Sequence, residues 1–122
     1  MIIPHSRPWI TKEDIDLVNE VINSEMIAQG QLVKEFEKLV GDYLQLQPGI
    51  AAVSGTAALV LALQAINTGK GSEIILPTYV CNSVLDAIIS VGATPVVCDI
   101  GSNWVMTEKE VGHLVSEKTV AI

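Results

Sequence analysis

The sequence has few cationic residues and no long apolar run, and each shortage argues against a class of protein. Seven Lys and Arg residues stand against 14 Asp and Glu residues, which gives a formal net charge of −7. A chain this acidic, with its cationic residues scattered, has no basic face that could grip nucleic acid. No apolar run reaches the ~18 residues of a membrane span, and residues 1–8 lack the layout of a signal peptide. We therefore expect a cytoplasmic protein that binds neither nucleic acid nor membrane.

Cysteine and histidine are also scarce. Cys81 and Cys98 lie far apart with no second pair, so the sequence indicates neither a zinc site nor a disulfide framework. We expect both to be buried reduced thiols, which is the usual state of free cysteine. His5 and His113 have no carboxylate or cysteine nearby at the spacing of metal ligands. No metal site is predicted.

Apolar residues, in contrast, are abundant enough to build a core, at 49% of the 122 positions. The first part of the chain is helical and amphipathic. Thr11 with Asp14 three residues later resembles a capping box, which predicts a helix that ends near Ser24. A second helix carries Val33, Phe36, Val40 and Tyr43 on one face, so we expect a surface helix that covers a core on one side. The pattern changes near residues 47–49, and we divide the chain into residues 1–48 and 49–122.

Short apolar runs alternate with helical stretches in residues 49–122, which is typical of βαβ units and a mostly parallel sheet. The sequence predicts strands at 50–53, 73–76 and 94–99. Helices are predicted from about residue 56 to 66, from about 82 to 91, and from Thr107, where Glu110 completes a capping box. The helix at 56–66 is apolar nearly all round, so we expect it to be buried. The predicted fold class is α/β, with a three-layer arrangement and two helices in front.

Residues 119–122 look like the first half of a further strand. A parallel strand that stops there leaves an open sheet edge and an uncovered apolar face, which is a liability for a free-standing domain. From this pattern we expect the chain to be a truncated fragment of a longer protein.

Ligands of parallel α/β sheets bind beyond the carboxyl ends of the strands, so the turns there are the candidate sites. The first turn combines Gly55, which has no side chain, with the hydroxyl groups of Ser54 and Thr56 and with consecutive backbone N–H groups at a helix start. These are the parts of an anion cradle. The same residues also suit simple helix capping, and composition favours neither interpretation.

Two further turns carry polar residues. After the second strand, Tyr79 or Cys81 could face a flat ring, or Tyr79 could be core while Asn82 or Ser83 caps the next helix. After the third strand, Asp99 could bind a hydroxyl group or serve the turn itself.

Several segments together resemble a known family. They are SGTAAL at 54–59, NTGKGSEIILP at 67–77 and VGATPVVCDI at 91–100, together with residues 3–8 and 30–37. In this order they resemble the DegT/DnrJ/StrS-type sugar aminotransferases, which are pyridoxal 5'-phosphate (PLP) enzymes of the aspartate aminotransferase fold, fold type I. The resemblance implies that residues 49–122 are the start of the large PLP-binding domain.

The same resemblance implies roles for individual residues. Gly55, Thr56 and Ala57 would cradle the phosphate of PLP, in agreement with the anion-site interpretation of that turn. The position where the family usually places an aromatic side chain against the cofactor ring falls on Cys81. Either Cys81 packs against the ring or Tyr79 supplies the aromatic surface, and we favour Cys81.

Family chemistry needs a lysine that forms a Schiff base with PLP and a carboxylate at the pyridine nitrogen. In the family both lie downstream of the region matched here. No lysine of this sequence stands in the family's lysine context: Lys12, Lys34, Lys38, Lys70, Lys109 and Lys118. We therefore expect no catalytic residue in these 122 residues, and no activity from them alone.

The resemblance implies an aminotransferase that moves an amino group from an amino acid to a keto group of a nucleotide-linked sugar, for polysaccharide or amino-sugar synthesis. We expect the amino donor to be glutamate. It would act as a homodimer. One alternative is a sugar dehydratase of the same family, in which histidine replaces the lysine. The other is a non-catalytic truncated product that acts as a scaffold or interaction module.

Overall fold

The computed structural model of the chain describes residues 5–122, which form two compact units. The first ends at Ala51 and the second spans Ala52–Ile122. Ile3 and Pro4, which belong to the N-terminal segment of the family resemblance, lie outside the described residues.

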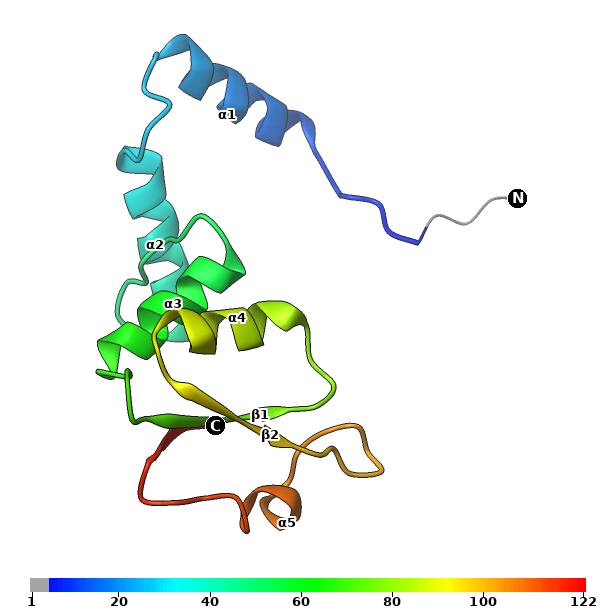
Figure 1. Cartoon of the computed structure of the whole chain (residues 1–122). Coiled ribbons are helices and arrows are strands. Elements are labelled where there is room, and N and C mark those ends of the chain that lie inside the picture. Colours follow the sequence, from blue (N-terminus) through cyan, green and yellow to red (C-terminus); the bar gives the residue numbers. More distant parts are fainter. Residues whose placement is uncertain (1–4) are drawn as a thin grey trace. The chain divides into compact units, whose positions relative to one another are not determined.

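The first unit contains two helices, α1 at Lys12–Asn23 and α2 at Gln31–Leu44 (Figure 1). The predicted capping box is confirmed. The backbone N–H of Asp14 donates to Thr11 Oγ1, and the backbone N–H of Thr11 donates to Asp14 Oδ2 at 2.7 Å. After α2 the chain turns back at Gln45, which has a left-handed backbone. Ala51 then donates its backbone N–H to Glu37 Oε1 at 2.8 Å.

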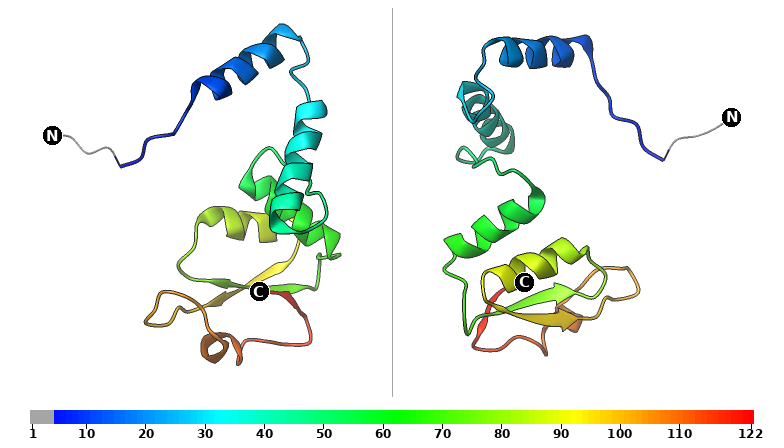
Figure 2. Two further views of the ribbon diagram at one scale, coloured as in Figure 1. Left: turned by 180° about the vertical axis from the view of Figure 1, so that it is seen from behind. Right: turned by 45° about the horizontal axis from the view of Figure 1, so that its top comes forward.

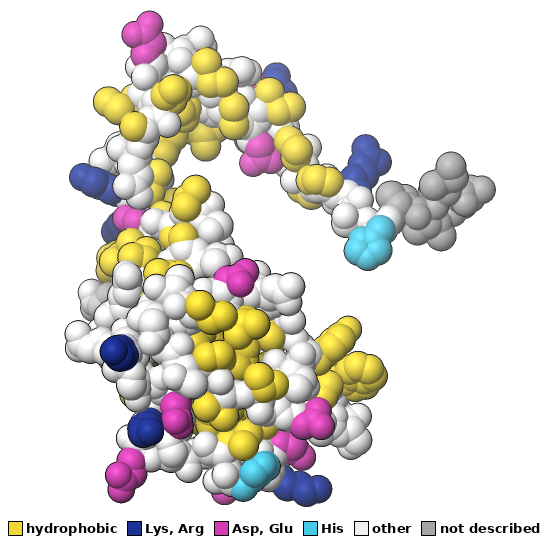
Figure 3. All heavy atoms as spheres, viewed as in Figure 1, with side chains coloured by type: hydrophobic (Ala, Val, Ile, Leu, Met, Phe, Trp, Pro, Cys, Tyr) yellow, Lys and Arg dark blue, Asp and Glu magenta, His cyan; other side chains and the backbone are white. Residues whose placement is uncertain are grey.

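The apolar faces of these helices are exposed, and Figure 3 shows hydrophobic side chains along the surface of α1. No residue of α1 is buried, and Gly41 is the buried residue of α2. Phe36 is 60% exposed and Tyr43 is 87% exposed. The helices at these positions were predicted, but the expectation that α2 covers a core with its apolar face is wrong for the residues described.

The second unit is built on a parallel sheet of three strands in the order β2-β1-β3. The strands are β1 at Glu73–Pro77, β2 at Thr94–Cys98 and β3 at Thr119–Ala121. Pro77 aligns with Cys98, so β1 and β2 end together at one edge of the sheet. The α/β class and the parallel sheet are therefore as predicted.

Helices lie on both faces of this sheet, which gives three layers (Figures 1 and 2). Helices α3 at Gly55–Ala65 and α4 at Asn82–Ser90 cover one face, where Ile74 and Leu76 of β1 pack against Ile88 of α4. On the other face Ile75 packs with Val111 of the short helix α5, Glu108–Val111. Alternate residues of β1 thus point into two apolar clusters, as the period of a strand requires.

Two expectations about the chain before β1 are wrong. Residues 50–53 form no strand, and Ile50 and Val53 are 84% and 96% exposed. A strand is defined by hydrogen bonds to a neighbour, and these residues have no neighbouring strand among those described. The predicted helix at 56–66 exists as α3, but the expectation that it is buried is wrong, because none of its residues is buried. Leu63 is partly buried against the core, whereas Leu61 on another side of the helix is 48% exposed.

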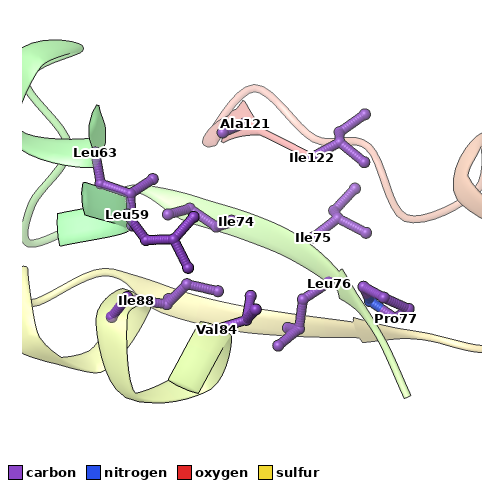
Figure 4. Close-up of a pocket in the computed structure, with 11 residues that line it drawn as sticks. Leu59, Leu63, Ile74, Ile75, Leu76, Pro77, Val84, Ile88, Ala121 and Ile122 are labelled. Atoms are coloured by element: carbon purple, nitrogen blue, oxygen red, sulfur yellow. The ribbon is translucent and has the colours of Figure 1, made fainter. Parts of the chain in front are cut away.

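A small apolar cavity of about 160 Å³ lies beside the sheet (Figure 4). Side chains of α3, β1, α4 and the C-terminal residues Ala121 and Ile122 line it. It is part of the core region on that face rather than a polar site. Among residues 5–122, no helix is both long and apolar enough to cross a bilayer.

Candidate cofactor site

The turn before α3 is held by its own side chain. Ser54 is the N-cap, with an extended backbone, and its Oγ accepts a hydrogen bond from the backbone N–H of Ala57 at 3.1 Å. The N–H of Ala58 donates to the carbonyl oxygen of Ser54. The N–H groups of Gly55 and Thr56 belong to the first turn, where the helix itself supplies no acceptor. Two adjacent donors at a helix start are therefore available to an anion.

The turn before α4 places a thiol at the equivalent position. Cys81 is the N-cap of α4, so the expectation that Asn82 or Ser83 caps this helix is wrong. The hydroxyl of Ser83 donates to Cys81 Sγ at 3.4 Å. This hydrogen bond is the main cause that lowers the pKa of the Cys81 thiol below its ordinary value.

The two cysteines differ in environment, so the expectation that both are buried is wrong for Cys81. Both are free, but Cys81 is exposed whereas Cys98 is buried. Burial raises the pKa of the Cys98 thiol, with smaller contributions from the negative charges of Glu110 and Asp99. The difference follows from position, since Cys98 points into the sheet core while Cys81 stands at a helix start.

A single open cavity of about 630 Å³ joins the two turns. It is lined by residues of α3 and of the α4 start: Gly55, Thr56, Ala58, Leu59, Ala62, Cys81 and Ser83. Three of the four residues expected to contact a cofactor thus share one concave surface. The fourth, Ala57, lies in the same turn with its N–H directed to Ser54. The lining combines an apolar helix face with backbone donors and a thiol, as small-molecule sites commonly do.

The other candidate residues lie at the carboxyl ends of β1 and β2. Asp99 serves its turn, because its Oδ1 accepts from the N–H of Ile100 at 3.0 Å and from Thr78 Oγ1 at 3.3 Å. Tyr79 is 70% exposed, so the interpretation of Tyr79 as core is wrong. Its ring instead meets the ring of Trp104 edge to face, with centroids 5.3 Å apart. No cluster of three or more potential metal ligands occurs within residues 5–122.

The sequence profile of the DegT/DnrJ/EryC1/StrS aminotransferase family matches residues 8–122. The chain belongs to this family. It is 40% identical over 101 residues to the spore coat polysaccharide biosynthesis protein SpsC of Bacillus subtilis, covering 83% of this chain and 26% of that protein. It is 32% identical over 122 residues to the GDP-perosamine synthase of Escherichia coli O157:H7, covering 98% of this chain and 34% of that enzyme. This chain therefore spans about a third or less of the length of these relatives.

Solved structures show the same fold. A putative sugar aminotransferase of Streptococcus pneumoniae, Spr1654, superposes with a TM-score of 0.90 at 35% identity, in its PLP form and equally in its pyridoxamine phosphate (PMP) form. The match covers 96% of this chain and 30% of Spr1654. These comparisons confirm the family resemblance and the fold class.

The sequence pattern does not indicate the roles of two residues. Ser83 lines the cavity and donates to the Cys81 thiol instead of capping α4. Trp104 pairs with Tyr79. The residues of this pair are 25 positions apart, so only the pairing of β1 with β2 brings them together.

Proposed function

We propose that the protein is a PLP-dependent aminotransferase, or part of one, that acts on a nucleotide-linked keto-sugar in polysaccharide or amino-sugar synthesis. The observation that carries the proposal is the shared cavity. It combines a helix start with free N–H donors at Gly55 and Thr56 and the thiol of Cys81, in a chain of a sugar aminotransferase family. The names of the relatives, a polysaccharide biosynthesis protein and a perosamine synthase, support a sugar substrate.

In this proposal residues 49–122 begin the cofactor-binding domain and the preceding residues 1–48 form a helical segment. The start of α3 would hold the phosphate of PLP. The N–H groups of Gly55 and Thr56 and the Thr56 hydroxyl would donate to it, and Ala57 belongs to the same turn. The positive end of the α3 dipole adds to these charge-assisted bonds.

Cys81 lines the same cavity and would contact the cofactor ring from the start of α4. The thiol is small, so it leaves room that a larger aromatic side chain would fill. When bound, PLP supplies the electron sink for amino transfer. The 122 residues contribute the binding of its phosphate and ring.

We further propose that these residues by themselves are inactive. The residues that line the cavity include no lysine, and the chain's lysines stand outside the family's lysine context. The amino donor is proposed to be glutamate, and the protein is proposed to be a cytoplasmic homodimer. In the relatives, the catalytic lysine would lie in the parts that this chain does not span.

Replacing Thr56 with Val tests the phosphate site. The variant keeps the shape of the side chain but removes the hydroxyl, so PLP affinity measured by absorbance titration should fall by about 1.5–3 kcal/mol, the range for a hydrogen bond to a charged group. Thr56→Ser is the matched control, because it retains the hydroxyl and should bind nearly as well. Equal affinity of all three proteins would remove the Thr56 hydroxyl from the phosphate contacts.

Borohydride reduction with PLP, followed by peptide mapping, tests the absence of a catalytic lysine. We expect no stoichiometric PLP adduct on any lysine of residues 1–122. A specific adduct on one of them would contradict the proposal that the reactive lysine lies elsewhere.

A further inference from the structure

The structure has an exposed aromatic pair at the carboxyl ends of two neighbouring strands. Tyr79 follows β1 and Trp104 follows β2, and these neighbouring strands end together at Pro77 and Cys98. The two rings meet at an interplanar angle of 66°, yet the residues remain 70% and 67% exposed. Large aromatic side chains that are ordered against each other but open to solvent offer contact area to a ligand at a low entropic cost.

The backbone of Trp104 has an unusual conformation. Its φ of +65° lies in the left-handed region, which a bulky side chain rarely adopts. A tight turn maintains this conformation. The N–H of Trp104 donates to the carbonyl oxygen of Gly101 at 3.0 Å, and the N–H of Gly101 donates to the carbonyl oxygen of Val105 at 3.0 Å. Residues held in such sparsely populated backbone conformations cluster at active sites and ligand-binding segments, and here the residue is Trp104, whose indole ring meets Tyr79.

Polar groups lie next to this pair along the chain. Thr78 directly precedes Tyr79 and donates its hydroxyl to Asp99 Oδ1. The N–H of Ile100 also donates to Oδ1, so within the described residues Oδ2 of Asp99 keeps its capacity to accept. The segment then continues to Cys81 and Ser83, which line the cofactor cavity. Tyr79 is therefore separated by one residue, Val80, from Cys81 of the cofactor cavity.

The charges here favour a neutral ligand group rich in hydroxyls. Asp99 is exposed, and Glu110 lies across the same turn, with its Oε1 3.3 Å from where a Cβ on Gly101 would stand. Two carboxylates disfavour a phosphate group by like-charge repulsion. A hydroxyl group can donate to a carboxylate, and the apolar face of a sugar ring can pack on an aromatic ring.

We propose that Tyr79 and Trp104 form the contact surface for the sugar ring of the substrate, with Asp99 accepting a hydrogen bond from a sugar hydroxyl. This assignment rests on the proposed function, because it takes the substrate to be a nucleotide-linked sugar. It places the sugar ring, rather than the base or the diphosphate, on the aromatic pair.

Tryptophan fluorescence reports directly on this contact. The sequence has two tryptophans, so the Trp9→Phe variant leaves Trp104 as the remaining one of these 122 residues. The purified protein is titrated with UDP-N-acetylglucosamine, GDP-mannose and dTDP-glucose, and with UDP, GDP and dTDP as the matched nucleotides without sugar. We expect at least one sugar nucleotide to change the emission of Trp104 at a concentration where its nucleoside diphosphate does not.

Calorimetry on variants separates the roles of the two rings. Trp104→Ala and Tyr79→Ala should each weaken binding of the responding sugar nucleotide by roughly 3- to 10-fold, as expected for the loss of one aromatic contact. Tyr79→Phe, which keeps the ring, is the matched control and should bind as the unaltered protein does. PLP affinity should stay unchanged in all three variants.

Three results would overturn the proposal. The first is the absence of any emission change with all three sugar nucleotides, and the second is an equal change with the nucleotide alone, which assigns the pair to the base. The third is loss of self-association in Trp104→Ala with sugar-nucleotide affinity retained, which assigns the pair to a subunit interface. Failure of PLP to bind would instead count against the proposed function, since the emission and calorimetric readouts do not use the cofactor.

Discussion

The hydroxyl oxygen of Ser54 lies 3.1 Å from the backbone nitrogen of Ala57 and accepts its hydrogen bond. This contact caps α3 and at the same time takes up one of the N–H groups that a phosphate at the helix start would use. Capping and anion binding are therefore coupled at this turn. Gly55 and Thr56 remain as the donors that do not depend on Ser54.

Substitutions of Ser54 should separate these two roles. Ser54→Ala removes the cap and should lower the free energy of unfolding by about 1 kcal/mol, measured by urea denaturation. Ser54→Asp keeps a capping oxygen and should preserve stability, but its negative charge beside the phosphate should weaken PLP binding by roughly tenfold or more. If the Asp variant bound PLP as tightly as the unaltered protein, the phosphate would have to bind elsewhere.

Gly55→Ala should affect binding more than folding. A Cβ on Gly55 would meet no atom within 4 Å and Gly55 has no positive φ, so the substitution fits the folded chain. Alanine in a helix is about 0.5–1 kcal/mol more favourable than glycine, so thermal stability should be equal or slightly higher. The added methyl group would project at the cavity wall and should reduce PLP affinity. Gly49→Ala, whose Cβ also meets open space, is the control that should change neither property.

The pH dependence of alkylation should distinguish the two cysteines. The hydrogen bond from Ser83 lowers the pKa of Cys81, so a larger thiolate fraction persists at lower pH and iodoacetamide should react there first. Cys98 is buried with a raised pKa and should stay unmodified in the folded protein. Ser83→Ala should shift the rate profile of Cys81 to higher pH, as measured by mass spectrometry.

PLP should also slow the alkylation of Cys81 if the thiol faces the cofactor ring. The Thr56→Val variant, at a PLP concentration that leaves its site mostly empty, should lose this protection. An unchanged pH profile in Ser83→Ala would show that the hydroxyl does not act on the thiol, and full reactivity in the presence of bound PLP would remove Cys81 from the cofactor contacts.

Core packing predicts a contrast between two adjacent isoleucines of α4. Ile88 is 1% exposed and packs against Ile74 and Leu76, whereas Ile89 is 56% exposed. Ile88→Ala should lower the free energy of unfolding by about 2–5 kcal/mol because it removes buried methyl groups and leaves a cavity. Ile89→Ala should change it by about 0.5 kcal/mol or less. Similar losses in both variants would mean that Ile89 is covered in the protein in solution.

Helix boundaries were the features most easily read from the sequence. Thr11 with Asp14, and Thr107 with Glu110, form the capping boxes that their spacing predicts. A cap is a contact between residues three apart, so the sequence contains all the atoms that make it. The strands at β1 and β2 were also found, because each is a short apolar run bounded by turn residues.

The candidate site was only partly predictable. The turn at Gly55 and Thr56 was selected from its own residues, and Cys81 from the family resemblance, and the structure brings these three to one cavity. The contribution of Ser83 and the pairing of Tyr79 with Trp104 were not foreseen. Both depend on side-chain directions that spacing along the chain does not specify.

The sequence by itself thus determined the α/β class, the family and the capping boxes at Thr11 and Thr107, since these follow from apolar periodicity, ordered motifs and contacts between residues three apart. Only the tertiary structure decided that residues 50–53 form no strand, that α3 is half exposed, and that Cys81 is open while Cys98 is buried. The physical reason is the same in each case. Strand pairing and burial are relations between segments distant in sequence, and a residue acquires them only from the neighbours that folding places beside it.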